Sequence, residues 1–249
     1  MYAAIQGIAM IIYIIVLTFY GKYYGFSKGK SFILGFLAVS VDYVVILLMT
    51  WVENGFRSFG AQNAVRVFVF NPLLIFLVAK AMKIDYRKYC DYNAFPAMVW
   101  YGLGHIACIT EGCCGSFSYN EGTFLYKVAY ALTGTDKLPQ QIFETIGALI
   151  IAAILLAIGI KYKFKTNGYM YHLMLVLYGS QRFFFEFFRN NYKVIVFRRL
   201  YSAQGEFGIS NLALWALAMF VEGAIFIAVF YHIDKKRKKE TDVKPVEAR

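Results

Sequence analysis

Two arginines and a glutamate stand inside an aromatic run that would otherwise suit lipid. The run reads Tyr-Gly-Ser-Gln-Arg-Phe-Phe-Phe-Glu-Phe-Phe-Arg, and its charged members are Arg182, Glu186 and Arg189. An ionised side chain at the centre of a membrane helix costs about 2.5–3.5 kcal/mol, so such residues normally face a partner or a polar cavity. At helical spacing the three share one face. Because a guanidinium suits two phosphate oxygens, the run indicates a phosphate site; the alternative is a structural ion pair in which Glu186 neutralises Arg182.

A second polar group opens the apolar segment that follows Pro139. Gln141 and Glu144 are three residues apart and would share a helical face. Pro139 suits the first turn of a helix, and a glutamate near a helix N-terminus is favoured by the helix dipole. These residues therefore indicate either a binding site or only the ordinary preference of proline and glutamate for the start of a helix.

A third group combines His105, Cys108 and Glu111 at intervals of three residues, followed by Cys113 and Cys114. The thiol or the imidazole could act as a nucleophile or a base. Cys113 or Cys114 could instead form a disulfide on an oxidising side of a membrane, or the small residues could let helices approach closely. The paired arms typical of zinc sites are absent from this segment, so we expect no metal and no cofactor.

Asp42 stands in the middle of another apolar segment without an opposite charge nearby in the sequence. We expect it to line a pocket and to pair with Arg66 or with an arginine of the aromatic run.

The elements that must position these groups are long apolar segments. The chain has 249 residues, of which 59% are hydrophobic and 16% charged, as is typical of a multi-pass membrane protein. A span needs about 20 apolar residues. We therefore expect an all-α integral membrane fold with about seven transmembrane helices, and we expect the first segment to be retained as a helix because it lacks the features of a signal peptide. The segments are 3–20, 32–52, 64–82, 94–112, 139–160, 168–188 and 211–232.

The net charge of +11 is distributed over alternate loops and the C-terminal end of the chain. This positive-inside pattern predicts an outer N-terminus and a cytoplasmic C-terminus, and it argues against a nucleic-acid partner. The last outer loop is the exception, since Arg189, Lys193, Arg198 and Arg199 make it basic, and we interpret it as an outward anion-binding surface. We expect a membrane domain over 1–239 and a disordered cytoplasmic tail over 240–249.

Taken together, these motifs resemble the prolipoprotein diacylglyceryl transferase family. The pattern YGxxRFxxEFxR is complete over 178–189, and PxQ(I/L)(Y/F)E stands at 139–144. The run GxIxCxxxGCC at 104–114 and Gly-Ile-Ser at 208–210 are similar to further family segments. The resemblance covers nearly the whole chain and is most specific from about 102 to 210.

The resemblance implies an enzyme of the bacterial cytoplasmic (inner) membrane that takes phosphatidylglycerol as lipid donor. Such an enzyme moves the diacylglyceryl group to the thiol of a lipobox cysteine and releases glycerol phosphate. Arg182 matches the family arginine and would clamp the phosphate. Tyr178, Gln141, Glu144 and Glu186 occupy other matching pocket positions.

Several family positions differ in this chain. His105 stands where the family has an arginine, Cys108 replaces an asparagine, and Cys113 replaces an acidic residue. Leu138 replaces a histidine, and the family's histidine before the third span has only Phe-Gly-Ala at 59–61 as its counterpart. The second span also lacks the family's arginine.

These departures leave two hypotheses. A divergent transferase would bind phosphatidylglycerol or a related anionic lipid and transfer its glyceryl-lipid portion to a thiol, such as that of a lipobox protein, or to another acceptor. A non-catalytic descendant would be a lipid-binding or assembly subunit of a membrane complex. For the first we expect catalytic roles for His105, Glu144 and Arg182, and lipid contacts from Tyr178, Gln141, Glu186, Arg189, Cys108 and Glu111.

Overall fold

The computed structural model describes the chain except residues 54, 58–63, 112–115, 117, 189–209 and 244–249. Its described part is helical apart from one isolated bridge between Ser118 and Lys137. The helices are α1 (Tyr2–Tyr20), η1 (Gly21–Tyr24), α2 (Lys28–Glu53), α3 (Ala64–Ala81), α4 (Tyr86–Glu111), α5 (Phe124–Thr133), α6 (Gln140–Lys161), α7 (Tyr169–Glu186) and α8 (Asn211–Val243).

Seven long helices coincide with the seven apolar segments read from the sequence, so the all-helical fold class is confirmed. Among the described residues, four stretches are long and apolar enough to cross a membrane, namely 2–24, 28–52, 140–161 and 212–239. Helices α4 and α7 contribute His105 and Arg182 to the site described below.

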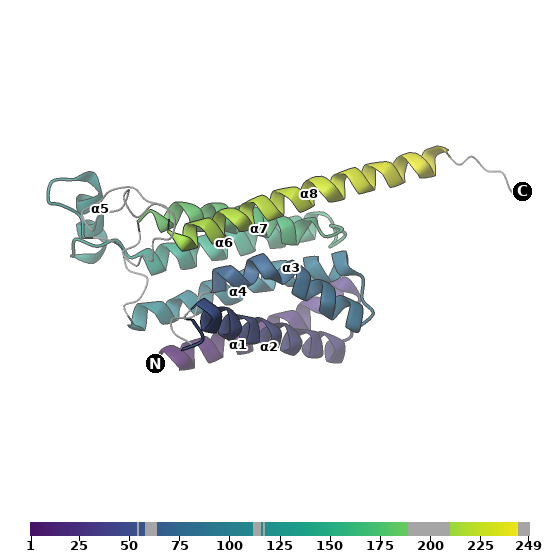
Figure 1. Ribbon diagram of the computed structural model, residues 1–249, viewed down its shortest axis with the longest axis horizontal. Helices are drawn as coiled ribbons and strands as arrows, with labels where there is room; N and C mark the ends of the chain where they lie inside the picture. Colours follow the sequence, from purple (N-terminus) through teal and green to yellow (C-terminus); the bar gives the residue numbers. More distant parts are fainter. Residues whose placement is uncertain (54, 58–63, 112–115, 117, 189–209, 244–249) are drawn as a thin grey trace, which may run out of the picture.

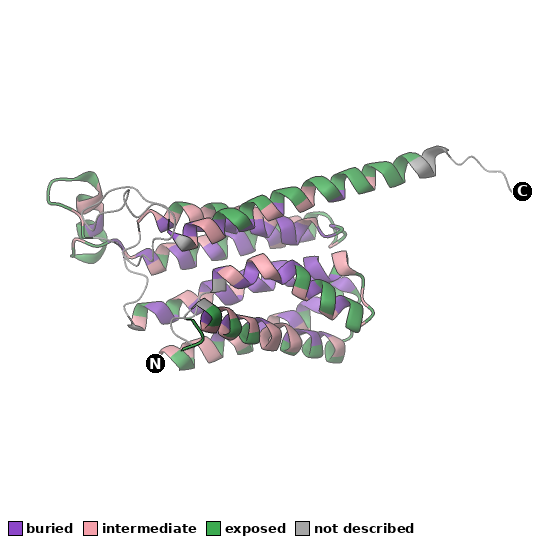
Figure 2. Cartoon of the chain, viewed as in Figure 1, coloured by how far each residue is buried: buried purple, intermediate pink, exposed green. Residues whose placement is uncertain are grey.

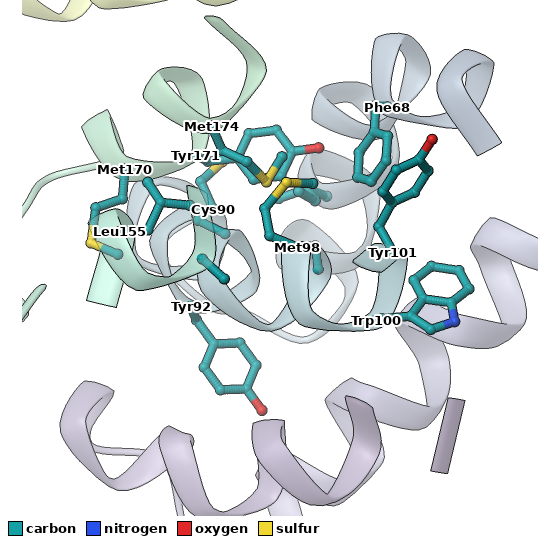
Figure 3. Close-up of a cluster of buried hydrophobic side chains, with 14 of the residues drawn as sticks. Phe68, Cys90, Tyr92, Met98, Trp100, Tyr101, Leu155, Met170, Tyr171 and Met174 are labelled. Carbon is teal, nitrogen blue, oxygen red and sulfur yellow. The ribbon is translucent and has the colours of Figure 1, made fainter. Parts of the chain in front are cut away.

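The helices form two layers, with α6, α7 and α8 on one side and α1 to α4 on the other (Figure 1). Helix α4 is central, because it contacts α1, α3, α6 and α7. Figure 3 shows its side chains reaching in both directions, with Tyr92 toward one set of helices and Met98 toward another. The Tyr92 hydroxyl donates to the Leu17 and Ser31 carbonyls at 3.1 and 3.2 Å, which ties α4 to α1 and α2.

Large apolar side chains are exposed along the outside of the bundle (Figure 2). Phe19, Phe36, Leu48 and Ile150 are among them, each on a helix that meets the span criteria. A soluble bundle would bury such residues, whereas lipid tails solvate them at no cost. The exposure pattern therefore agrees with a membrane protein.

At the end where α4 and α7 begin, Asp91 of α4 organises the chain before α7. Its carboxylate accepts hydrogen bonds from the Thr166 hydroxyl at 2.6 Å and from the backbone N–H groups of Gly168 and Met170 at 2.7 and 2.9 Å. These N–H groups belong to the first turn of α7, where intrahelical partners are lacking. Asp91 therefore fixes where α7 starts relative to α4.

Helix α8 is longer than the predicted span and projects past the bundle (Figure 1). Asp234 on this extension pairs with Arg87 of α4 at 2.6 Å and accepts from the Tyr169 hydroxyl at 3.1 Å. The first residues of the predicted tail 240–249 continue α8 as far as Val243, and 244–249 lie outside the described residues.

The segment between α4 and α6 contains helix α5, which is not among the seven apolar segments expected from the sequence. Thr123 caps its first turn by accepting from the Tyr126 N–H at 3.2 Å, and Gly134 ends it in a left-handed conformation. Ser116 then accepts a hydrogen bond from the Leu138 N–H at 2.6 Å and anchors the segment at the start of α6.

Candidate functional site

Arg182 of α7 is the centre of a buried ion-pair cluster. Its Nη1 lies 2.5 Å from Oε1 of Glu144, and its Nη2 lies 3.2 Å from Oε2 of Glu186. The three side chains are between 1% and 2% exposed. A buried charge is tolerated only when it is paired and hydrogen-bonded, and here one guanidinium sits between two carboxylates.

His105 of α4 joins the cluster through the same glutamate. Its Nε2 lies 2.5 Å from Oε2 of Glu144 and 3.3 Å from the Tyr101 hydroxyl. An ionised carboxylate can only accept, so Nε2 carries the proton and Nδ1 keeps a lone pair when the ring is neutral. The His105 side chain is 12% exposed, which makes it more accessible than Glu144 or Arg182.

Three helices bring these residues together at one end of the bundle. This is the end where α4 and α7 finish and α6 and α8 begin (Figure 1). His105 lies in the last two turns of α4, Arg182 lies in the last two turns of α7, and Glu144 lies in the second turn of α6. The positive end of the α6 dipole favours the carboxylate of Glu144 at that place.

Two glutamines hold α6 against α7 beside the ion pairs. The Gln140 side chain donates to the Phe185 carbonyl at 2.9 Å, and that of Gln181 donates to the Glu144 carbonyl at 3.3 Å. Gly147 makes room for the second contact, because a Cβ there would lie 2.2 Å from the Gln181 amide nitrogen. These bonds fix the helix register that places Glu144 opposite Arg182.

Ser210 connects the cluster to the start of α8. Its hydroxyl donates to Oε1 of Glu186 at 3.0 Å and accepts from the Ala213 N–H at 3.0 Å, as an N-cap does. Ser210 is the last member of the Gly-Ile-Ser motif, and Gly208 and Ile209 lie outside the described residues. Glu186 therefore links α7 to the cap of α8.

Tyr178 forms an aromatic wall one turn before Arg182. It is 1% exposed, and its ring lies 4.6 Å from that of Tyr101 and 5.4 Å from that of Phe68. Tyr101 in turn packs on His105 with ring centres 4.4 Å apart. Tyrosine rings thus lie beside both the His105 imidazole and the Arg182 guanidinium. They exclude water, which strengthens the electrostatic interactions within the cluster.

The Nε atom of Arg182 is buried and has no hydrogen-bond acceptor among the described residues. Leaving a buried donor unpaired costs about 1–3 kcal/mol, and more for a charged group. Such a donor at the centre of a cluster indicates a position for an additional acceptor oxygen.

The structure places five of the expected site residues close together, namely His105, Glu144, Arg182, Glu186 and Tyr178. Other expected residues contribute differently. Arg189, Cys113 and Cys114 lie outside the described residues, as does the side chain of Glu111. Cys108 is buried on α4, and Gln141 is half-buried, whereas its neighbour Gln140 is the fully buried member of the pair.

The expected ion pair of Asp42 is not found among the described residues, where no arginine lies within ion-pair distance of its carboxylate; Arg189 lies outside them. Asp42 does line a cavity, as expected, together with Asn71. Helix α4 contributes Tyr89, Asn93 and Ala97 to the wall of that cavity.

Sequence reasoning missed Tyr101, Gln140 and Gln181 as site residues. Tyr101 was detectable in principle, because it precedes His105 by four residues and must share its helix face. The two glutamines carried no such signal, since their partners are backbone carbonyls of another helix.

Comparisons with known proteins identify the family of this chain. The family model described as prolipoprotein diacylglyceryl transferase matches residues 1–229. A phosphatidylglycerol–prolipoprotein diacylglyceryl transferase 2 from Clostridium perfringens is 25% identical over 238 residues, which is 90% of this chain and 87% of the relative. A phosphatidylglycerol–prolipoprotein diacylglyceryl transferase from Clostridium tetani is 21% identical over 262 residues, or 96% of this chain and 94% of the relative. The match spans the helices that carry the ion-pair cluster, and the chain belongs to the prolipoprotein diacylglyceryl transferase family.

Proposed function

We propose that this protein binds phosphatidylglycerol or a related anionic lipid and transfers its glyceryl-lipid portion to a thiol or another acceptor. The observation that carries the proposal is the buried Arg182 with an Nε–H that has no acceptor among the described residues. A phosphate oxygen is the acceptor that a guanidinium prefers. The names of the two clostridial relatives give phosphatidylglycerol as their lipid and prolipoprotein as their substrate.

The reaction is an alkyl transfer to sulfur. The acceptor thiol loses its proton to a base, and the thiolate attacks the glyceryl carbon that bears the phosphate ester. A carbon–sulfur bond forms while the carbon–oxygen bond to phosphate breaks, and glycerol phosphate leaves with the bonding electron pair. The leaving phosphate gains negative charge, which Arg182 would stabilise.

His105 is the base in this proposal, and Glu144 orients it. The contact with Oε2 of Glu144 places the proton on Nε2, so Nδ1 is the nitrogen that receives the thiol proton. The Glu144 carboxylate then stabilises the imidazolium that forms. Because the same carboxylate contacts Arg182 at 2.5 Å, base and phosphate clamp are held in one fixed geometry.

We further propose seven membrane spans, an outer N-terminus and a location in the bacterial cytoplasmic membrane, with a membrane domain over 1–239. The basic stretch Lys235–Lys239 lies on the α8 extension, at the end of the bundle opposite the ion-pair cluster. If that basic end faces the cytoplasm, the cluster faces the outer leaflet.

A second candidate function is a non-catalytic lipid-binding or assembly subunit. The observation that favours it is the closure of the cluster, since Arg182 is 2% exposed and already engaged by two carboxylates. In that case the ion pairs are structural, and any bound lipid is held without being cleaved.

The test is to incubate the purified protein with phosphatidylglycerol labelled in its acyl chains and a lipobox peptide. A peptide with serine in place of the cysteine is the acceptor control. We expect label on the cysteine peptide only, a loss of at least about 100-fold in His105→Gln, as is typical for removal of a general base, and full activity in Arg57→Ala, an exposed loop arginine. Copurifying phosphatidylglycerol without label transfer would favour the non-catalytic subunit.

A further inference from the structure

A second polar site lies within the helices α1, α2, α3 and α4. Asp42 stands near the middle of α2 (Lys28–Glu53), 14 residues after its first residue, or about 21 Å along a helix that rises 1.5 Å per residue. At that place a bilayer about 30 Å thick offers no water. Asp42 is nevertheless 5% exposed, so its carboxyl group faces the protein interior.

The surroundings of Asp42 provide oxygen atoms and no basic side chain. The Asn71 side chain of α3 lies within hydrogen-bonding reach of the Asp42 carboxyl. Among the described residues no lysine, arginine or histidine pairs with Asp42. An ionisable residue at membrane depth normally has a charged or strongly polar partner, and here the described residues supply the Asn71 amide but no positive charge.

Asp42 and Asn71 line an internal cavity together with Tyr13, Tyr89 and Asn93. The amide of Asn93 is fixed, because its Oδ1 accepts from the Tyr13 hydroxyl at 3.1 Å and its Nδ2 donates to the Tyr89 carbonyl at 2.7 Å. The Asn93 Oδ1 and the Tyr13 hydroxyl oxygen each retain an unused lone pair. The cavity thus presents carboxylate, amide and hydroxyl oxygens from α1, α2, α3 and α4.

The size of the cavity limits what it can hold. It has about 10 Å³ of room for the centre of a water-sized sphere, which corresponds to one water molecule or one small ion. A lipid head group or a peptide side chain cannot enter such a space. The single carboxylate is neutralised by one positive charge, whereas a divalent cation would leave a net charge buried in the bilayer and normally takes more carboxylates.

We propose that this cavity binds one small monovalent cation of the Na⁺ class, held by the carboxylate of Asp42 and by oxygens of Asn71, Asn93 and Tyr13. The cation supplies the charge that Asp42 lacks and ties α1, α2, α3 and α4 into one body. The site is separate from the ion-pair cluster, because Asn93 precedes His105 by 12 residues, about 18 Å along α4. The proposal therefore stands whether or not the lipid-transfer activity is present.

The test compares thermal unfolding of the full-length protein in detergent with NaCl or with choline chloride at equal ionic strength. A ligand that binds only the folded state raises Tm. We expect Tm to be about 3 °C or more higher in NaCl for the wild type, and the difference to vanish in Asp42→Asn. The matched control Asp136→Asn, on the outer segment, should keep the full difference.

A direct measurement of ion binding to the wild type tests the proposal even if a variant does not fold. Equilibrium binding of radioactive ²²Na⁺ to the wild type should be saturable at one ion per chain and competed by unlabelled NaCl. Asn71→Leu, which keeps the side-chain volume, should weaken that binding at least about tenfold, the equivalent of one lost hydrogen bond. Absence of saturable binding, or an equal salt effect on Tm in wild type and Asp42→Asn, would overturn the proposal.

Discussion

Glu144 and Arg182, which are 38 residues apart in the chain, meet at 2.5 Å in the bundle interior, and the second oxygen of the same carboxylate meets His105. One glutamate thus holds a cation on each side. This shared carboxylate makes the three residues one electrostatic unit, so a change in any of them is expected to alter the other two.

The first prediction concerns the loss of that shared charge. Glu144→Gln leaves Arg182 with Glu186 alone and removes the orienting group of His105. Removing one partner of a buried ion pair lowers the free energy of unfolding by about 3–5 kcal/mol. We expect a correspondingly lower free energy of unfolding by chemical denaturation in detergent, and unchanged stability in Glu121→Gln, which changes an exposed loop residue. Equal stability of both variants would contradict a buried ion pair.

A double substitution measures the coupling between Glu144 and Arg182. Glu144→Leu with Arg182→Met replaces both charges by apolar groups of similar size, while Glu186 keeps its charge. Once one partner of the pair is absent, replacing the other removes no Glu144–Arg182 interaction. We expect the double variant to lose less unfolding free energy than the sum of the two single losses, and strict additivity would show that the two residues do not interact.

The second prediction tests the helix register at the site. Gly147→Ala would place a Cβ 2.2 Å from the Gln181 amide, so Gln181 must move and lose its bond to the Glu144 carbonyl. We expect a loss of about 1–2 kcal/mol in unfolding free energy. Introduced into a Gln181→Ala background, Gly147→Ala should cost much less, because the clashing side chain and its bond are already absent. Gly7→Ala is the matched control, because a Cβ there meets nothing within 4 Å and alanine favours a helix.

The third prediction concerns the closest approach of two helices. A Cβ at Gly179 of α7 would lie 2.8 Å from the Ala216 carbonyl oxygen and 2.8 Å from the Phe220 nitrogen, both backbone atoms of α8. Backbone cannot rotate away as a side chain does, so Gly179→Ala must separate the helices. Overpacking of this kind costs about 1–3 kcal/mol. We expect a lower Tm than that of Gly7→Ala, measured by tryptophan fluorescence, and a tolerated Gly179→Ala would contradict the close contact.

Much of the fold could be predicted from the sequence, because a long apolar segment is typical of a membrane helix. The pair Arg182 and Glu186 was also readable, since four residues on one helix fix the contact. The contact of Glu144 with Arg182 was not, because it depends on how α6 packs on α7, and only the family resemblance placed both in one pocket. Helix α5 was missed although Thr123 and Gly134 are ordinary cap residues, since the polar composition around them favoured loop.

The error about Asp42 has a similar physical origin. A lone carboxylate in an apolar segment demands a partner, and arginine was the obvious choice from composition. The structure instead places Asp42 in a cavity whose other polar side chains, those of Asn71, Asn93, Tyr13 and Tyr89, are neutral. The sequence alone indicates that the Asp42 carboxyl group needs a polar partner, but it does not show which residues of neighbouring helices lie beside it.

The fourth prediction concerns the role of Tyr101, whose hydroxyl lies 3.3 Å from Nε2 of His105. Tyr101→Phe removes that hydroxyl but keeps the ring that packs on His105 and Tyr178. We therefore expect an unchanged Tm. If the hydroxyl holds the His105 ring in place for proton transfer, its loss should lower kcat for thiol transfer rather than raise KM.

Tyr101→Ala is the comparison that distinguishes positioning from packing. It removes the ring as well, and truncation of a buried aromatic side chain costs about 3–5 kcal/mol. We expect this variant to lose stability and activity together, whereas Tyr101→Phe lowers kcat alone. A Tyr101→Phe variant with an unchanged kcat would mean that the hydroxyl does not act on His105 and that Tyr101 contributes only its ring.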